Sequence, residues 1–226
     1  MAKLLQPEFY RSDFRHPGME GHRIFYPWAG HGDFGAFARR VEYGTGNFRL
    51  YVIWTFASQA AMRHPGADLW ECGVWKGQSA KFLAEIALRA RSHLHLFDTF
   101  EGMPQTDPQK DFHRKGNFSD TSLEGVKNFL SEYRDTAVFH PGFIPDTFSG
   151  LENSQIAFVN IDVDIYKSVK DSLEFVYPRM LPGGIILFDD YGWHSCPGAR
   201  QAVDEFAERM SLLPMILPSG QAIITT

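Results

Sequence analysis

The sequence is poor in cysteine and has no long apolar stretch. Its two cysteines, Cys72 and Cys196, lie far apart among 226 residues and form no CxxC pair. This spacing argues against a zinc framework and favours two free thiols in a reducing compartment. No apolar run approaches the ~18 residues of a membrane span, and the first residues lack the apolar segment of a signal peptide. We therefore expect a cytoplasmic protein without a membrane partner.

The chain also lacks an excess of positive charge. Its formal net charge is −5 and its isoelectric point is near 6.0. Proteins that bind nucleic acid or anionic membranes normally present a basic face, so we expect no nucleic-acid partner. Hydrophobic residues make up 44% of the chain, and a core of this size needs no disulfide or structural metal for stability.

Residues 1–65 differ in composition from the rest. The stretch "HPGMEGHRIFYPWAGHGDFGAF" is rich in glycine, proline and aromatic residues, which predicts irregular structure. A helical period follows from Phe48 and ends before "HPG" at 64–66. We expect residues 1–65 to form an N-terminal cap or lid and residues 66–226 to form one domain.

The second part alternates apolar runs with helical patterns. We expect a parallel sheet covered on both faces, and hence an α/β fold. Expected strands cover 68–74, 93–98, 137–142, 156–162 and 184–190, expected helices cover 77–92, 123–134, 165–177 and 198–210, and a hairpin covers 214–226. Ligands of such sheets bind at the carboxyl ends of the strands, where the strand order reverses.

The first strand leads into the loop "ECGVWKGQS", where Gly73 and Gly77 are spaced as G-x-x-x-G. This spacing matches neither a dinucleotide fingerprint nor a phosphate-binding P-loop. Ser79 opens the next helix, where a carboxylate can bind, and Asp98 ends the second strand, where an acid suits a ribose diol. An adenosine with an amino-acid tail and no phosphate describes S-adenosylmethionine. The alternatives are that the glycines only permit a turn and that Asp98 caps a helix.

Acidic residues end the fourth and fifth expected strands. Asp162, Asp189 and Asp190 converge if these strands are neighbours, and the repulsion between them suits a hard cation such as Mg²⁺. Asp164 is a candidate general base for a substrate hydroxyl, with Lys167 as the competing candidate. The alternatives are that Asp164 caps the following helix and that Asp189 and Asp190 are turn residues.

Five motifs, "ECGVWKGQSA", "DTFEGMP", "NIDVDIYKS", "PGGIILFDDYG" and "CPGARQAVDEF", resemble the macrocin O-methyltransferase family and occur in the family's order over roughly residues 45–226. Members of this family methylate deoxysugar hydroxyls of macrolide and aminocoumarin antibiotics. The resemblance implies a class I, Rossmann-like methyltransferase with a mostly parallel seven-stranded sheet, a C-terminal antiparallel hairpin and an N-terminal helical cap. It also implies S-adenosylmethionine and Mg²⁺ as cofactors.

The resemblance further implies roles for individual residues. Asp162, Asp189 and Asp190 match the family's metal-binding aspartates, and Asp164 matches its proposed catalytic base. Cofactor contacts are implied for Glu71, Gly73, Gly77 and Ser79 in the first loop, for Asp98 and Thr99 after the second strand, and for Gly142 and Phe143 after the third. The family often has tryptophan in the "PGF" segment, so stacking by Phe143 departs from its pattern.

The sequence thus predicts a Mg²⁺-dependent O-methyltransferase acting on a hydroxyl, in particular a sugar hydroxyl, of a small natural product. The resemblance also suggests a homodimer. One rival is a metal-dependent glycosyltransferase, because "DVD" resembles the DxD motif that holds a nucleotide sugar. The second acid pair and the first loop count against it. Another rival is a non-catalytic S-adenosylmethionine-binding module, and an NAD-dependent oxidoreductase is disfavoured because G-x-G-x-x-G is missing.

Overall fold

The structure is a computed structural model that describes residues 32–42 and 48–226. The chain divides into two compact units, residues 1–51 and 52–226. In the first unit, helix α1 (Gly32–Arg40) buries Phe34, Phe37 and Ala38. The sequence predicts irregular structure over much of this segment, and that prediction is wrong for α1. The i, i+3, i+4 spacing of the buried residues gives the segment an apolar helical face that outweighs its glycines. The cap assignment of residues 1–65 stays a prediction.

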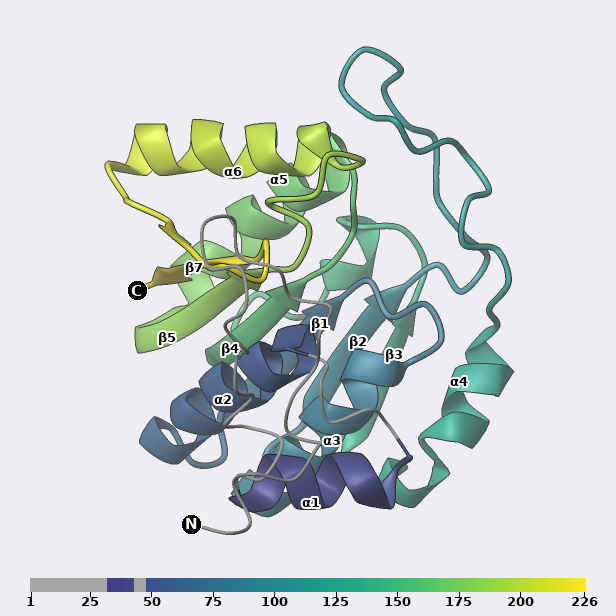
Figure 1. Cartoon of the computed structure of the whole chain (residues 1–226), viewed down its shortest axis with the longest axis vertical. Coiled ribbons are helices and arrows are strands. Elements are labelled where there is room, and N and C mark those ends of the chain that lie inside the picture. Colours follow the sequence, from purple (N-terminus) through teal and green to yellow (C-terminus); the bar gives the residue numbers. More distant parts are fainter. Residues whose placement is uncertain (1–31, 43–47) are drawn as a thin grey trace, which may run out of the picture. The chain divides into compact units, whose positions relative to one another are not determined.

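The second unit is built on a seven-stranded sheet (Figure 1) with the order β3-β2-β1-β4-β5-β7-β6. The strands are β1 (Asp68–Cys72), β2 (Leu94–Asp98), β3 (Ala137–Pro141), β4 (Ile156–Ile161), β5 (Met180–Phe188), β6 (Met215–Ile216) and β7 (Ala222–Thr225). Strands β1 to β5 pair in parallel, while β7 is antiparallel to β5 and to β6. The predicted α/β fold with a C-terminal antiparallel hairpin is confirmed.

Five further helices are α2 (Phe48–Arg63), α3 (Gln78–Ala90), α4 (Leu123–Phe129), α5 (Tyr166–Val176) and α6 (Pro197–Met210). The prediction of a helix over 123–134 is wrong at the C-terminal end. Helix α4 stops before Leu130, and a short 3₁₀ helix, Ser131–Tyr133, follows. The buried Tyr133 hydroxyl donates to Glu85 Oε2 on α3 at 2.8 Å. This tertiary contact favours the tighter turn. Among the described residues, no helix is both long and apolar enough to cross a membrane.

Both faces of the sheet carry aromatic packing. On one face, Trp54 of α2 meets Phe82 of α3 edge-on, with ring centroids 6.1 Å apart. On the other face, the ring centroid of Trp70 of β1 lies 4.6 Å from that of Phe97 of β2 and 6.2 Å from that of Phe175 of α5. All six residues of β4 are buried. Continuous burial of a central parallel strand needs cover on both faces, as the sequence predicts.

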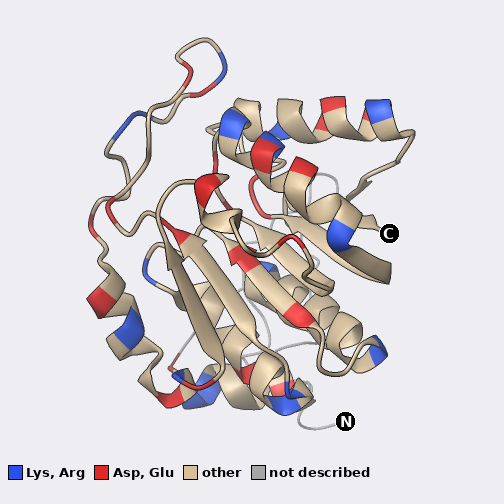
Figure 2. Cartoon of the chain, turned by 180° about the vertical axis from the view of Figure 1, so that it is seen from behind, with Lys and Arg blue, Asp and Glu red and all other residues tan. Residues whose placement is uncertain are grey.

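The strand order reverses at β1, which pairs with β2 on one side and β4 on the other. In open α/β sheets this reversal marks a crevice beyond the carboxyl ends of the strands. Figure 2, which shows the molecule from behind, has acidic positions at these strand ends and in the loops just beyond them. This edge of the sheet is therefore the candidate site.

Candidate functional site

The loop after β1 closes directly onto the end of β4. The Gly73 N–H donates to the Phe97 carbonyl at 2.8 Å, and the Asp162 N–H donates to the Cys72 carbonyl at 2.8 Å. Gly73 has φ +87, and a Cβ atom there would lie 1.8 Å from the Asp162 carbonyl oxygen. Only glycine permits this approach, which joins the predicted cofactor loop to the first predicted metal ligand.

Glu71 lies at the base of this loop and is fully buried. The Asn160 amide on β4 donates to Glu71 Oε1 at 3.0 Å. Burial raises the pKa of Glu71 to about 8, although hydrogen bonds from Asn160 and Ser79 oppose the rise. Glu71 is therefore largely a neutral acid at neutral pH, able to donate as well as accept a hydrogen bond.

Asp98, the predicted ribose acid, joins the first two strand-end loops. Its Oδ2 accepts from the backbone N–H groups of Val74 at 2.7 Å and Trp75 at 2.9 Å, and its Oδ1 accepts from Phe100 at 2.7 Å. These bonds occupy three of the roughly four acceptor positions of a carboxylate. A diol at Asp98 would use the remaining position or displace a loop N–H. The neighbouring Thr99 hydroxyl donates to the Gly102 carbonyl at 2.7 Å and holds the turn.

Two other predicted cofactor positions lie in the first turn region of α3. Gly77 has φ +81, and a Cβ atom there would meet Val126 Cγ1 of α4 at 3.0 Å. The glycine thus permits close packing of α3 on α4. Ser79 is the second residue of α3 and is half-buried, so it lies at the positive end of the helix dipole.

The loop after β3 supplies the last predicted cofactor positions. The Gly142 N–H donates to the Asp98 carbonyl at 2.9 Å, which brings this loop to the end of β2. The Phe143 side chain is 52% exposed. Its ring is therefore accessible from solvent, and its contact with the cofactor stays a prediction.

Asp162, Asp189 and Asp190, which we call the carboxylate triad, come together as the sequence expects. Each offers one carboxylate oxygen, and these oxygens all lie within 4.8 Å of one another. Asp189 and Asp190 are buried, with 4% and 6% exposure. Two buried carboxylates and one half-buried carboxylate this close together favour a positive partner. An oxygen-only set of this kind fits Mg²⁺.

Two hydrogen bonds orient the triad. Gln221, the residue before β7, is fully buried, and its amide donates to Asp189 Oδ1 at 2.5 Å. The backbone N–H of Asp164 donates to Asp190 Oδ2 at 3.0 Å. Gln221 is not predictable from the sequence, because a single glutamine in a hairpin carries no local signal of an acidic partner 32 residues away.

Asp164, the predicted base, lies at the end of β4 in the left-handed conformation, with φ 57. The first residues of α5 are capped by another acid, since Asp111 Oδ1 accepts from the Tyr166 N–H at 2.9 Å. The N-cap residue of α5 is Ile165, which makes no side-chain cap hydrogen bond. Lys167, the competing candidate, forms an ion pair with Asp171 on α5, and its side chain is 71% exposed.

Two residues that the sequence analysis did not propose surround Asp164, and we call His113, Asp164 and Cys196 the mixed cluster. Asp164 Oδ1 lies 3.7 Å from His113 Nε2 and 3.4 Å from Cys196 Sγ. Cys196 Sγ lies 3.6 Å from His113 Nε2. Cys196 stands in the motif "CPGARQAVDEF", which could have drawn attention to it, whereas His113 is an unmarked residue in a charged loop.

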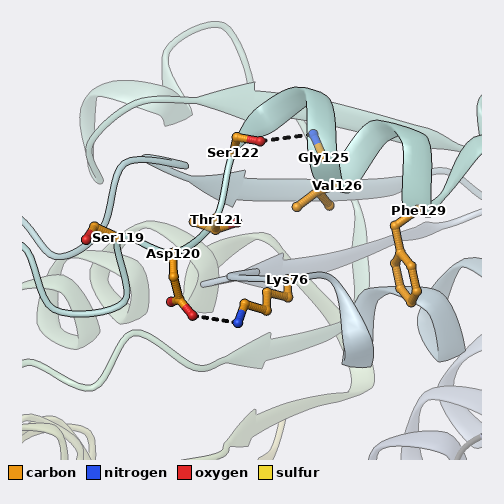
Figure 3. A pocket seen from close by; sticks show the side chains of 8 residues that line it. All are labelled: Lys76, Ser119, Asp120, Thr121, Ser122, Gly125, Val126 and Phe129. Atoms are coloured by element: carbon orange, nitrogen blue, oxygen red, sulfur yellow. Dashed lines mark hydrogen bonds and ion pairs between the residues drawn. The ribbon is translucent and has the colours of Figure 1, made fainter.

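A pocket of about 470 Å³ lies beside the first loop (Figure 3), lined by Lys76, Ser119, Asp120, Thr121, Ser122, Gly125, Val126 and Phe129. None of these is a predicted cofactor or metal residue. Lys76 Nζ pairs with Asp120 Oδ2 at 2.5 Å, as Figure 3 shows, and Trp75 Nε1 donates to Asp120 Oδ1 at 2.8 Å. The pocket thus adjoins a junction between the loop after β1 and the segment before α4.

Comparison with known proteins gives this edge of the sheet a family context. The profile of the Macrocin-O-methyltransferase (TylF) family matches residues 41–216. The chain belongs to the macrocin O-methyltransferase family. This match includes the loop after β1, the carboxylate triad and the mixed cluster, and it confirms the resemblance that the sequence motifs indicate.

Curated relatives of this family member have named acceptors. A Streptomyces olivaceus protein named 8-demethyl-8-(2,3-dimethoxy-alpha-L-rhamnosyl)-tetracenomycin-C 4'-O-methyltransferase is 33% identical over 162 residues, which are 66% of this chain and 60% of that protein. Mycinamicin III 3''-O-methyltransferase of Micromonospora griseorubida is 32% identical over 161 residues, 64% of this chain and 61% of that protein. The matched part of this chain thus spans about 60% of these relatives' length.

Solved structures agree with the fold. The O-methyltransferase NovP superposes with a TM-score of 0.69 at 25% identity, covering 78% of each chain. The calicheamicin methyltransferase CalS11 superposes with a TM-score of 0.68 at 20% identity, covering 85% of this chain and 82% of that chain. The second likeness concerns the fold alone.

Proposed function

We propose that this member of the macrocin O-methyltransferase family is a Mg²⁺-dependent enzyme. In this proposal it moves a methyl group from S-adenosylmethionine to a sugar hydroxyl of a small natural product. The observation that carries the proposal is the convergence of Asp162, Asp189 and Asp190 beside the glycine loop after β1. The names of the relatives support a sugar-bearing acceptor.

The residues present fit both groups. The carboxylate triad would hold Mg²⁺, which supplies positive charge that lowers the pKa of an acceptor hydroxyl. Gly73 lets the loop after β1 pack against Asp162, because a Cβ atom there would collide with the Asp162 carbonyl. Glu71, Ser79, Asp98 and Phe143 would contact S-adenosylmethionine, which supplies the transferable methyl group.

The chain's own residues then position and deprotonate the acceptor. In this mechanism, a carboxylate oxygen of Asp164 would accept the hydroxyl proton. The methyl group would pass to the acceptor oxygen as its bond to the sulfonium sulfur breaks, and S-adenosylhomocysteine would leave. The Asp164 backbone bond to Asp190 ties the base to the triad at 3.0 Å. Much of the rate gain would come from this positioning.

The test combines ligand binding with turnover. Calorimetry with S-adenosylmethionine, a UDP-sugar and NAD separates the methyltransferase from the glycosyltransferase and the oxidoreductase. Transfer of radiolabelled methyl to mycinamicin III or to the rhamnosylated tetracenomycin is then measured with Mg²⁺ and with a chelator. We expect S-adenosylmethionine to bind and transfer to require Mg²⁺. Absence of S-adenosylmethionine binding would refute the proposal, and binding without transfer to any sugar-bearing acceptor would favour the non-catalytic module.

A further inference from the structure

The mixed cluster has the dimensions of one face of a tetrahedral metal site. Its three ligand atoms are separated by 3.4, 3.6 and 3.7 Å. Tetrahedral zinc bonds to sulfur, nitrogen and oxygen of about 2.3, 2.0–2.1 and 2.0–2.2 Å place such atoms about 3.3–3.7 Å apart. Octahedral angles with the same bond lengths would require about 2.9–3.2 Å. Pair by pair, the observed triangle lies within about 0.2 Å of the tetrahedral arrangement, so only small side-chain shifts are needed.

The chemistry of these ligands differs from that of the carboxylate triad. An imidazole nitrogen, a thiol sulfur and one carboxylate oxygen suit a borderline ion such as Zn²⁺, whereas Mg²⁺ prefers oxygen alone. Three protein ligands with a fourth position left for a small ligand are typical of reactive zinc sites.

Each ligand is carried by an anchored backbone. The loop that bears His113 is held by Asp111, which is 3% exposed and accepts from the N–H of Tyr166. The Thr106 hydroxyl donates to the His113 carbonyl at 3.0 Å. Cys196 precedes α6, and its N–H donates to the Trp193 carbonyl at 3.0 Å. The cluster is thus organised by contacts outside itself.

The local charge also favours a cation. The carboxylates of Asp190 and Asp164 both act on the Cys196 thiol through their negative charge, and Asp164 Oδ1 accepts its S–H at 3.4 Å. The same negative potential attracts a divalent ion. When the ion binds, the sulfur–hydrogen bond is replaced by a sulfur–metal bond and the proton leaves to solvent.

We propose that His113, Asp164 and Cys196 form a second metal site, which takes a zinc-class divalent ion and is distinct from the carboxylate triad. A metal ion in this site would bind Asp164. It would also link the loop of His113 to the segment after β4 and to the start of α6. The next step rests on the proposed function, in which Asp164 is the base. Because a metal ion bound to Asp164 occupies that base, it inhibits methyl transfer even when Mg²⁺ is saturating.

Cobalt titration of the full chain in excess Mg²⁺ tests the site, because tetrahedral Co²⁺–thiolate centres absorb strongly and oxygen-only octahedral Co²⁺ absorbs weakly. We expect a thiolate charge-transfer band that saturates near one equivalent and is bleached by Zn²⁺. Cys196→Ser should abolish the band, and His113→Asn should weaken apparent Co²⁺ affinity by roughly tenfold or more. Cys72→Ala and His93→Asn are matched controls and should keep the band.

Absence of the band in the unmodified chain, or its persistence in Cys196→Ser, would overturn the proposal. Loss of the band in a folded Asp189→Asn variant with Cys196 intact would do the same, because it would locate the ion at the triad. If Cys196→Ser does not fold, His113→Asn on the loop decides the outcome by the same titration. The Co²⁺ band needs no turnover, so its presence in a chain without methyl transfer would support the metal site while refuting the proposed function.

Discussion

The carboxylate triad and the mixed cluster adjoin each other, yet they are assembled in different ways. The triad is carried by the ends of two neighbouring parallel strands, β4 and β5, whose register brings Asp162 near Asp189 and Asp190. The mixed cluster needs a residue from the loop between β2 and α4 and another from the start of α6. The comparison shows that the sheet can bring hard oxygen ligands together directly, while the gathering of softer ligands depends on how loops are anchored.

The strongest test of the comparison is substitution of Asp164, the member of the mixed cluster whose backbone N–H bonds to the carboxylate triad. We expect Asp164→Asn to lower kcat by about 10²–10⁴-fold, the usual contribution of a general base. Lys167→Ala should change kcat by less than about threefold, because its ammonium pairs with Asp171 on an exposed helix face and an exposed pair contributes little. Steady-state methyl transfer measures both. A large loss for Lys167→Ala with none for Asp164→Asn would transfer the role of base to the lysine.

The next test removes one member of the triad and leaves the mixed cluster intact. Asp189→Asn should lower Mg²⁺-dependent turnover by roughly 100-fold or more. Loss of a metal ligand should have a larger effect than loss of a residue that only hydrogen-bonds to a ligand. Calorimetric affinity for S-adenosylmethionine should stay within about threefold, since Asp189 follows β5 and does not belong to the loop after β1. Asp135→Asn, at an exposed position, is the control. Equal loss of turnover in the control would disprove a specific role for Asp189.

Gly73→Ala breaks the contact between the cofactor loop and the triad. The added Cβ would lie 1.8 Å from the Asp162 carbonyl at φ +87, so we expect a loss of about 3 kcal/mol or more in the free energy of unfolding. Gly66→Ala is a matched control with φ +82 and no atom within 4 Å of its Cβ. It should lose only about 1 kcal/mol of backbone strain. Urea unfolding distinguishes them, and equal losses would show that the clash is relieved cheaply.

Glu71, at the same edge of the sheet, makes the free energy of unfolding depend on pH. Its pKa is raised from 4.5 to about 8, so between these values the folded state holds a proton that the unfolded state has released. The free energy of unfolding should therefore fall as pH rises, by up to about 1.4 kcal/mol per unit between about pH 5 and 7. Glu71→Gln should flatten this component in urea unfolding without cofactor. A slope unchanged by Glu71→Gln would place the proton elsewhere.

The smallest effect on stability is expected for the ion pair between the loop after β1 and the segment before α4. The Lys76–Asp120 pair is exposed, with side-chain exposures of 51% and 63%, so Asp120→Asn should lower stability only slightly. Salt should weaken the contact further. Thermal unfolding at low and high ionic strength measures this, with Asp146→Asn as an exposed control. A loss as large as that of Gly73→Ala would show that the loop anchor matters as much as the sheet.

The order and type of the strands and helices in the second unit were predictable from sequence, because buried parallel strands appear as apolar runs between helical patterns. Helix α2 begins and ends at the predicted residues, Phe48 and Arg63. Prediction failed where distant contacts decide local conformation. The break after α4 depends on Tyr133 reaching Glu85, and the cap of α5 comes from Asp111, 55 residues before it.

The sequence by itself determined the family, the α/β sheet and the meeting of Asp162 with Asp189 and Asp190. The physical reason is that parallel strands deliver their carboxyl ends to one edge, so acids that follow two adjacent strands must converge. Only the tertiary structure decided that Gln221 orients Asp189, that Asp98 holds the first loop, and that His113 and Cys196 surround Asp164. These contacts join residues from segments whose spacing no local pattern encodes. They form only when loops and helix ends pack onto the finished sheet.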